Sequence, residues 1–147
     1  GDIAGMAQVH GRVHLPIIAD ESVYTLQDAR NLAHAKAADV FSIYVGKAGG
    51  IRCAKRICDF AESVGLSCTV GSNLEMGVGS AAMIHLAVAT SGIHPDVFPC
   101  DIIGPMFYED DLLAEPLPIK GGEARPPEKP GLGVELDDAK VEKYRVR

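Results

Sequence analysis

The sequence predicts an α/β protein built around a parallel sheet, and two observations carry this fold class. Short, nearly continuous apolar runs alternate with segments of helical periodicity up to about residue 104. Continuous apolar runs of this kind are typical of strands in a parallel sheet whose faces are buried under other elements such as helices. Two architectures fit this pattern: a doubly wound open sheet and part of an eight-stranded β/α barrel. Because four strands cannot close a barrel, the barrel interpretation implies a missing upstream half.

Each element has its own local signals. The predicted strands are 14–20, 39–45, 66–72 and 96–104. A helical pattern with apolar positions at Ile3, Met6, Ala7 and Val9 opens the chain, and the helices predicted after it are 25–37, 51–64 and 77–90. Thr25 is a cap for its helix and places Asp28 in the first turn, and Gly65 is a C-cap candidate. The fourth helix is apolar nearly all round, which predicts burial. Pro99 implies a bend or bulge in the fourth strand.

The two ends of the chain differ from this repeat. The first residue is Gly rather than Met, and the chain opens inside a helical pattern, so we expect a piece of a longer protein. Six of the nine prolines lie in the last 43 residues, which predicts an irregular tail from residue 106 to residue 147. The segment LDDAKVEKYRV near its end favours a short helix.

The amino-acid composition narrows the range of partners that this protein is expected to bind. The net charge of −6 disfavours nucleic acid and anionic membranes. No apolar run approaches the roughly 18 residues that a membrane span needs, and no signal peptide is visible. The four cysteines form no C-x-x-C pair. These features predict buried, reduced cysteines in a cytoplasmic protein.

Polar groups gather where the predicted strands end, which is where both architectures place their chemistry. These groups are Asp20, Glu21 and Ser22, the stretch 44–47, the stretch 72–75, and Asp101. Asp20 and Glu21 suit a hard cation such as Mg²⁺ or Mn²⁺, or else cap the following helix as an acid pair. Lys47 precedes Gly49 and Gly50, so it is not in a phosphate-binding loop.

Several motifs in order resemble the enolase superfamily, and within it the muconate-lactonizing and mandelate racemase group. They are P-I-I-A-D-E-S (16–22), D-V-F-S-I-Y (39–44), G-G (49–50), A-E-x-x-G (61–65), G-S-N-L-E (71–75), C-D-I-I-G-P (100–105), E-P-L (115–117) and P-G-L-G-V (130–134). Each motif is weak alone, but the ordered set is specific and spans nearly the whole chain.

The resemblance implies the second half of a (β/α)₈ barrel, strands five to eight, over residues 1–105. Residues 106–147 would be the C-terminal tail of that domain. The N-terminal capping domain and the first half of the barrel would then precede this chain.

The resemblance also implies a site. Family members bind one divalent cation through three carboxylates at strand ends, and the third ligand position falls on Asp20, with Glu21 orienting it. The family's strand-six lysine falls on Tyr44, and Lys47 lies three residues further on, at the margin of the pocket. Asp101 matches the strand-eight carboxylate. The catalytic candidates are therefore Tyr44, Lys47 and Asp101, and the substrate-binding candidates are Ser72, Asn73 and Glu75.

The expected function is that of a metal-dependent cycloisomerase, epimerase, racemase or dehydratase. Such an enzyme forms an enolate beside the carboxylate of a small substrate. The full-length protein would be a homo-oligomer, and this chain alone would be inactive. Two alternatives stay open: a non-catalytic ligand-binding relative that has lost the lysine, and a doubly wound nucleotide-binding domain.

Overall fold

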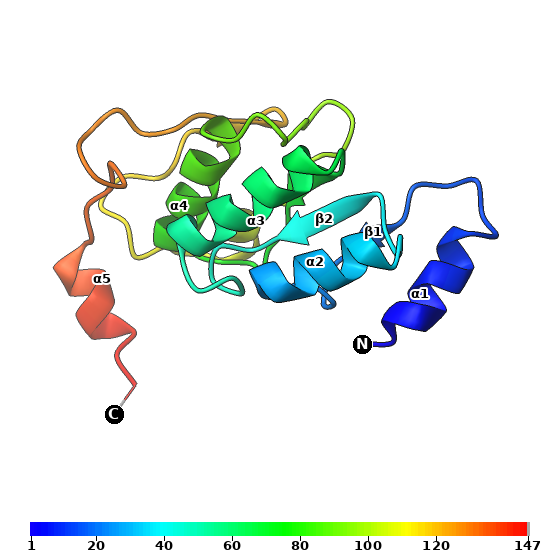
Figure 1. Ribbon diagram of the computed structural model, residues 1–147. Coiled ribbons are helices and arrows are strands. Elements are labelled where there is room, and N and C mark those ends of the chain that lie inside the picture. Colours follow the sequence, from blue (N-terminus) through cyan, green and yellow to red (C-terminus); the bar gives the residue numbers. More distant parts are fainter. Residues whose placement is uncertain (147) are drawn as a thin grey trace.

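The computed structural model describes residues 1–146, and its centre is a three-stranded parallel sheet in the order β1-β2-β3. The strands are β1 (Ile18–Ala19), β2 (Val40–Ile43) and β3 (Ser67–Val70). Helix α2 (Leu26–His34) joins the first two strands, α3 (Ile51–Ser63) joins the next two, and α4 (Gly77–Val88) follows β3. Because α2 contacts α3 and α3 contacts α4, these helices form one layer over the sheet (Figure 1). This is the singly wound arrangement of a β/α barrel, without the reversal of strand order that a doubly wound sheet needs.

The strands bury alternate side chains on opposite faces of the sheet. Ala19, Phe41, Ile43, Cys68 and Val70 belong to the core that the helices cover. The register pairs Ile18 with Val40, Val40 with Ser67 and Ser42 with Thr69. The residues between the core positions therefore share the other face. That face carries Asp20, Ser42 and Tyr44 at its carboxyl end.

The predicted helix caps are confirmed. Thr25 and Asp28 form a capping box, in which the Thr25 side chain accepts from the backbone of Asp28 and Asp28 accepts from the backbone of Thr25. Helix α3 ends with Gly65 at a φ of 78°. The N–H groups of Gly65 and Leu66 bond to the carbonyls of Glu62 and Ala61, which is the Schellman pattern.

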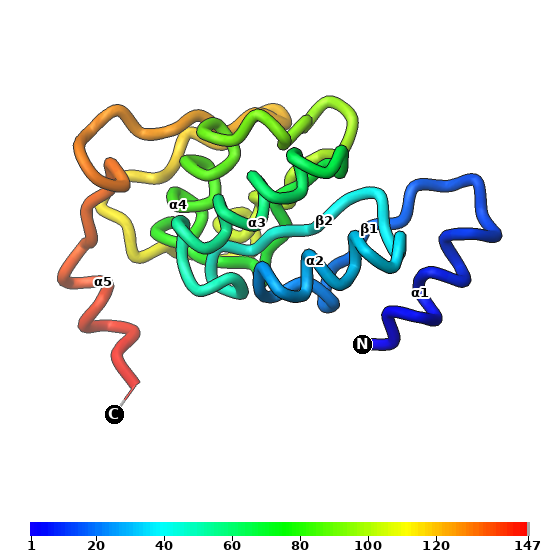
Figure 2. Tube along the Cα trace, in the orientation of Figure 1, coloured from blue at the N-terminus to red at the C-terminus, as the bar shows by residue number. Residues whose placement is uncertain are grey.

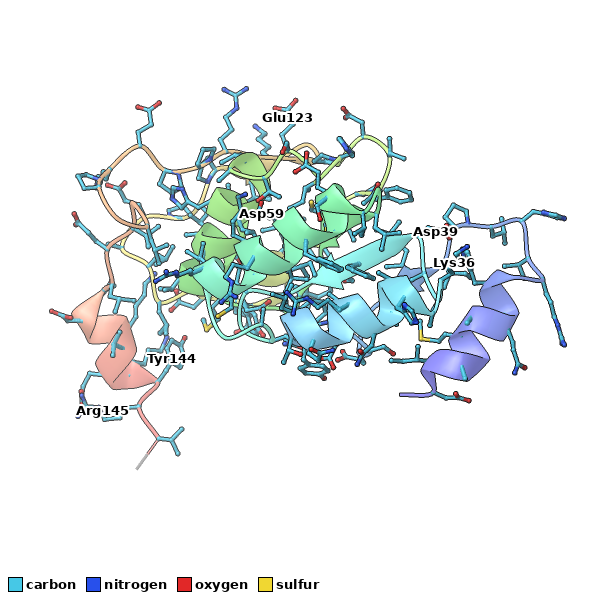
Figure 3. All side chains as sticks on the ribbon, in the orientation of Figure 1. Lys36, Asp39, Asp59, Glu123, Tyr144 and Arg145 are labelled. Atoms are coloured by element: carbon cyan, nitrogen blue, oxygen red, sulfur yellow. The ribbon has the colours of Figure 1, made fainter. Side chains whose placement is uncertain are left out.

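The predicted first strand is shorter in the structure. Residues 14–17 are not part of β1, because the backbone N–H of Ile17 donates to Oδ2 of Asp39 at 2.8 Å instead of joining a ladder. The neighbouring Pro16 has no N–H to offer. Nε2 of His10 donates to the carboxylate of the same Asp39 at 3.0 Å, which ties helix α1 (Ile3–His10) to the sheet. Figure 3 labels Asp39 on the side of the molecule where α1 lies.

The predicted fourth strand at 96–104 is wrong. Within residues 1–146 that segment contains no strand, and it meets β3 through a single backbone bond, from the N–H of Asp101 to the carbonyl of Val70 at 2.7 Å. A separate bridge joins Cys68 to Ile93. Pro95 and Pro99 interrupt the run between these two points, and a residue without an N–H cannot continue a ladder.

The C-terminal tail is irregular, as predicted. It contains the 3₁₀ helix η1 (Gly104–Phe107), the hairpin of β4 (Ile119–Lys120) and β5 (Glu123–Ala124), and helix α5 (Asp138–Lys143). The tail passes beside α4 before it reaches α5 (Figure 2). Oδ2 of Asp111 accepts from the N–H of Gly77 at 2.8 Å, so the tail caps the N-terminus of α4. Among the described residues, no helix is long and apolar enough to span a membrane.

Asp110 fastens α5 to the rest of the tail. Its carboxylate lies 3.0 Å from Nζ of Lys140 and 3.5 Å from Nζ of Lys143, and it accepts from the hydroxyl of Tyr144 at 3.1 Å. Tyr144 directly follows α5 (Figure 3). The bond from Lys140 is the main cause that lowers the pKa of Asp110 from 3.8 to about 2. A carboxyl whose pKa falls on folding stabilises the folded form only when it is ionised.

We therefore expect the docking of α5 to depend on pH in the acid range. It should be complete above pH 4 and should weaken as the pH falls from about 4 to about 2, because protonation of Asp110 removes the charge that Lys140 binds. Hydrogen exchange of the α5 amides across this range measures the effect. Asp110→Asn should abolish the pH dependence, whereas Asp138→Asn, the matched control in α5, should retain it.

The exposed apolar side chains predict self-association of this chain when it is expressed alone. Leu15 is 73% exposed, Ile18 on the edge strand β1 is 46% exposed, and Met106 is 70% exposed. Unpaired strand edges beside apolar surface favour intermolecular pairing. Analytical ultracentrifugation should find dimers or larger species, and Ile18→Lys should reduce them. A monodisperse monomer of the unmodified chain would contradict this expectation.

Candidate functional site

Asp20 lies directly after β1, and its carboxylate projects on the face of the sheet opposite the helices. Thr25, not Asp20, caps α2, so the interpretation of Asp20 as a helix-capping acid does not hold. Its side chain is 48% exposed. One carboxylate oxygen, Oδ2, accepts from the hydroxyl of Tyr44 at 2.9 Å, and the other, Oδ1, lies 3.1 Å from Nζ of Lys47.

Tyr44 ends β2 and places its phenol on the same face. The tyrosine is 6% exposed, and a Cβ on Gly71 would collide with its ring, so only glycine leaves room for the ring at that point of the neighbouring strand. Burial and then the hydrogen bond to Asp20 raise the pKa of Tyr44 to about 12. The phenol is therefore uncharged near neutral pH and acts as a hydrogen-bond donor.

The sequence led us to expect Lys47 at the margin of the site, but the structure places it in the interior of the site. Its side chain is 3% exposed, and its ammonium lies 3.9 Å from the centre of the Tyr44 ring. Alternation would put residues 44 and 47 on opposite faces of a continuing strand. The strand ends instead, and a turn closed by the bond from Ala48 N–H to the Tyr44 carbonyl folds Lys47 back over the ring.

Glu21 takes part only indirectly. Its Oε2 accepts from the hydroxyl of Tyr24 at 2.6 Å, and the Tyr24 ring lies 5.4 Å from Nζ of Lys47. Tyr24 is a residue that sequence reasoning missed. Nothing in its local pattern signals the contact, because the turn between β1 and α2 brings it there.

The remaining predicted residues form a second group at the end of β3. The hydroxyl of Ser72 donates to Oδ2 of Asp101 at 3.0 Å, and Oε2 of Glu75 accepts from the N–H of Asn73 at 2.9 Å. Asn73 and Asp101 are exposed, and Ser72 is half-buried. The group adjoins the first one, because Gly71 contacts the Tyr44 ring and a Cβ on Gly46 would lie 3.9 Å from Oε1 of Glu75.

The loop 72–75 is held in an uncommon backbone conformation that the sequence does not signal. Leu74 has a φ of 60°, which a branched residue rarely adopts. Its carbonyl accepts from the hydroxyl of Tyr108 at 2.9 Å. A Cβ on Gly104 would collide with the backbone of Glu75, so glycine is required for the tail to pass beneath the loop.

The described residues supply one ligand of a cation site, Asp20, and not a complete set of ligands. Among residues 1–146 no group of three or more His, Cys, Asp or Glu side chains could hold a metal ion. Asp20 is a hard oxygen ligand of the kind that Mg²⁺ and Mn²⁺ prefer. A carboxylate has about four lone-pair sites, and Asp20 uses two of them for Tyr44 and Lys47, so it can still bind a cation.

A cavity of about 900 Å³ lies elsewhere, between α4, the segment 90–103 and the β4–β5 hairpin. Cys100 and Ile102 line it, whereas Asp101 between them reaches Ser72. None of Asp20, Tyr44 and Lys47 lines this cavity. The polar groups at the strand ends therefore remain the candidate site.

Comparison with known proteins gives a consistent result. Residues 1–140 match the family described as enolase C-terminal domain-like. Muconate cycloisomerase 1 of Rhodococcus opacus is 37% identical over 132 residues, which are 90% of this chain and 35% of that protein. L-Ala-D/L-Glu epimerase of Bacillus subtilis is 35% identical over 133 residues, with the same two shares.

Solved structures agree with these relatives. The structure of 2-chloromuconate cycloisomerase from Rhodococcus opacus superposes with a TM-score of 0.93 at 34% identity. The match covers 99% of this chain and 39% of that one. The chain thus spans little more than a third of the length of these three relatives, each of which is named as a cycloisomerase or an epimerase.

We predict that Gly104→Ala destabilises the protein by about 1–3 kcal/mol, because the added methyl group has no room beside the backbone of the loop 72–75. Gly11→Ala is the matched control. A Cβ there would lie 3.5 Å from the nearest atom at an ordinary φ of −69°, so it should change little. Thermal unfolding of both variants measures the difference, and equal melting temperatures would contradict the close approach.

Proposed function

The chain belongs to the enolase C-terminal domain-like family, and on that premise we propose that the complete protein is an isomerase that acts on a small carboxylate substrate. We propose further that it depends on Mg²⁺ or Mn²⁺ and forms an enolate next to the substrate carboxylate. One observation carries the proposal: the Tyr44 hydroxyl and the Lys47 ammonium converge on Asp20 at the carboxyl ends of neighbouring parallel strands.

Asp20 is the residue of this chain that would hold the cation. Its carboxylate stays half exposed and keeps free lone pairs, while the further ligands lie outside the described residues. When bound, a divalent cation neutralises the negative charge that develops when a proton leaves the carbon beside a carboxylate. A chain with one ligand of three should bind the cation weakly and be inactive alone.

Tyr44 is assigned the role of a proton or hydrogen-bond donor. Its hydroxyl already donates to a carboxylate, and its pKa of about 12 keeps it protonated near neutral pH. A residue in that state can deliver a proton, but it cannot be the base that takes one. We therefore assign the base to a residue of the complete protein other than Tyr44.

The loop 72–75 and Asp101 are assigned to the substrate. The half-buried Ser72 donates to the exposed Asp101, and Gly104 and Tyr108 contact the backbone of the loop. Because the loop 72–75 is already fixed next to Tyr44, it would orient the substrate without a cost for ordering the loop.

A single donor and no second base suit a cycloisomerase better than a racemase. Racemisation at one carbon needs a group on each face that can both take and give a proton, whereas lactone formation needs proton delivery on one face. The 37% sequence identity to muconate cycloisomerase 1 also supports a cycloisomerase. A dehydratase, a lyase with one acid and one base, is the next candidate.

One observation favours a second class of function. A phenol stands where the resemblance places a lysine, and loss of that lysine is what a non-catalytic ligand-binding descendant would tolerate. Substrate turnover by the complete protein separates the two. Assays with muconate, 2-chloromuconate and L-Ala-D-Glu, each with and without Mn²⁺, test for lactone formation or epimerisation.

We predict that Tyr44→Phe slows turnover of the complete protein by roughly 10²-fold or more, the usual scale of a general acid. Folding should suffer little, with a loss of no more than about 2 kcal/mol for one hydrogen bond to a half-exposed carboxylate. Solvent deuterium incorporation at the substrate carbon measures the proton transfer directly. Incorporation at the unmodified rate in Tyr44→Phe would remove Tyr44 from the chemistry.

A further inference from the structure

Lys47 is the most deeply buried charged side chain of the candidate site. Its side chain is 3% exposed, although it lies in the turn between β2 and α3, where lysines are usually solvated. Lys55 shows the usual case: it is 36% exposed and pairs with Asp59 one turn further along α3. A lysine is buried to this extent only when its charge is fully paired.

All three N–H groups of the Lys47 ammonium have acceptors. They donate to the backbone carbonyl of Asp20 at 2.9 Å, to Oδ1 of Asp20 at 3.1 Å and to the backbone carbonyl of Ser42 at 3.2 Å. An ammonium has three donors and no acceptor, so this set satisfies it completely. The Tyr44 ring at 3.9 Å adds a cation–π contact.

These acceptors belong to two different strands. Asp20 follows β1 and Ser42 lies in β2, so the ammonium joins two strand ends as well as binding a side chain. Because Lys47 binds both the backbone and the carboxylate of Asp20, it fixes where the residue lies and where its side chain points. Tyr44 restrains the other carboxylate oxygen.

We propose that Lys47 is the positioning residue that holds the Asp20 carboxylate in the orientation required for cation binding, and that it does not contact the substrate. The inference rests on the proposed function, because it assumes that Asp20 binds a divalent cation in the complete protein. It departs from the sequence expectation, which gave Lys47 a place beside the substrate. No N–H group of Lys47 is left over for a substrate carboxylate.

The test is calorimetric titration of the complete protein with Mn²⁺ alone, for the unmodified protein and for Lys47→Met. Methionine has a similar length without charge or donors. We expect Mn²⁺ affinity to fall roughly 10- to 100-fold, the effect of losing a group that orients a metal ligand. Lys55→Met is the matched control and should bind Mn²⁺ as the unmodified protein does. At saturating Mn²⁺, KM for the substrate should not change, because Lys47 makes no contact with it.

Circular dichroism checks that each variant folds. If Lys47→Met does not fold, Lys47→Arg takes its place, because a planar guanidinium keeps the charge but cannot aim three donors at these three acceptors. Folded Lys47→Arg should then bind Mn²⁺ more weakly.

The outcomes are distinct. No Mn²⁺ binding by the unmodified protein would overturn the proposed function, and this inference with it. Binding by the unmodified protein with equal affinity in a folded Lys47 variant would overturn the positioning role alone. A raised KM at saturating Mn²⁺ with unchanged Mn²⁺ affinity would return Lys47 to the substrate.

Discussion

The alternation of side chains along three parallel strands is the constraint on which the rest of the structure depends. In each strand one set of residues packs under the helices, and the other set faces away from them. This forces Asp20, Ser42 and Tyr44 onto the same face, because their neighbours Ala19, Phe41 and Ile43 are needed in the core. A one-residue slip of β2 would bury Tyr44 under the helices and expose Phe41, so the hydrophobic core itself sets the register of the site.

How far the sequence predicts the structure depends on how local the determining interactions are. The helices and their caps at Thr25 and Gly65 were predictable because each depends on residues a few positions apart. The fourth strand was predicted wrongly because a β-rich run was given more weight than Pro95 and Pro99, which remove two ladder donors. The strand ends that carry the site were predictable from the repeat alone.

The details of the site were less predictable, because they arise from contacts that are distant in sequence. Asp20 and Tyr44 are 24 residues apart, and Asp20 and Lys47 are 27 apart. Lys47 was placed at the margin from the resemblance, because it lies three residues beyond the position of the family's lysine. The turn that begins at Tyr44 reverses that placement. Likewise the residue type of Leu74 does not predict its φ of 60°, and the loop contacts Tyr108 and Gly104 of the tail, which follow more than 25 residues later.

Asp20 binds both Tyr44 and Lys47, the two groups that we propose take the place of the lysine that the resemblance implies at position 44. Its carboxylate helps to keep the Tyr44 phenol protonated, because an ionised phenol beside an anion is unfavourable. The same carboxylate also accepts from the Lys47 ammonium, whose other contacts are neutral backbone carbonyls and aromatic rings. A lysine at position 44 would combine charge and proton transfer in one side chain. Here the charge lies on the buried Lys47, and the proton lies on the Tyr44 phenol, whose pKa is raised to about 12. The proposed role of Tyr44 is therefore to deliver a proton and not to abstract one.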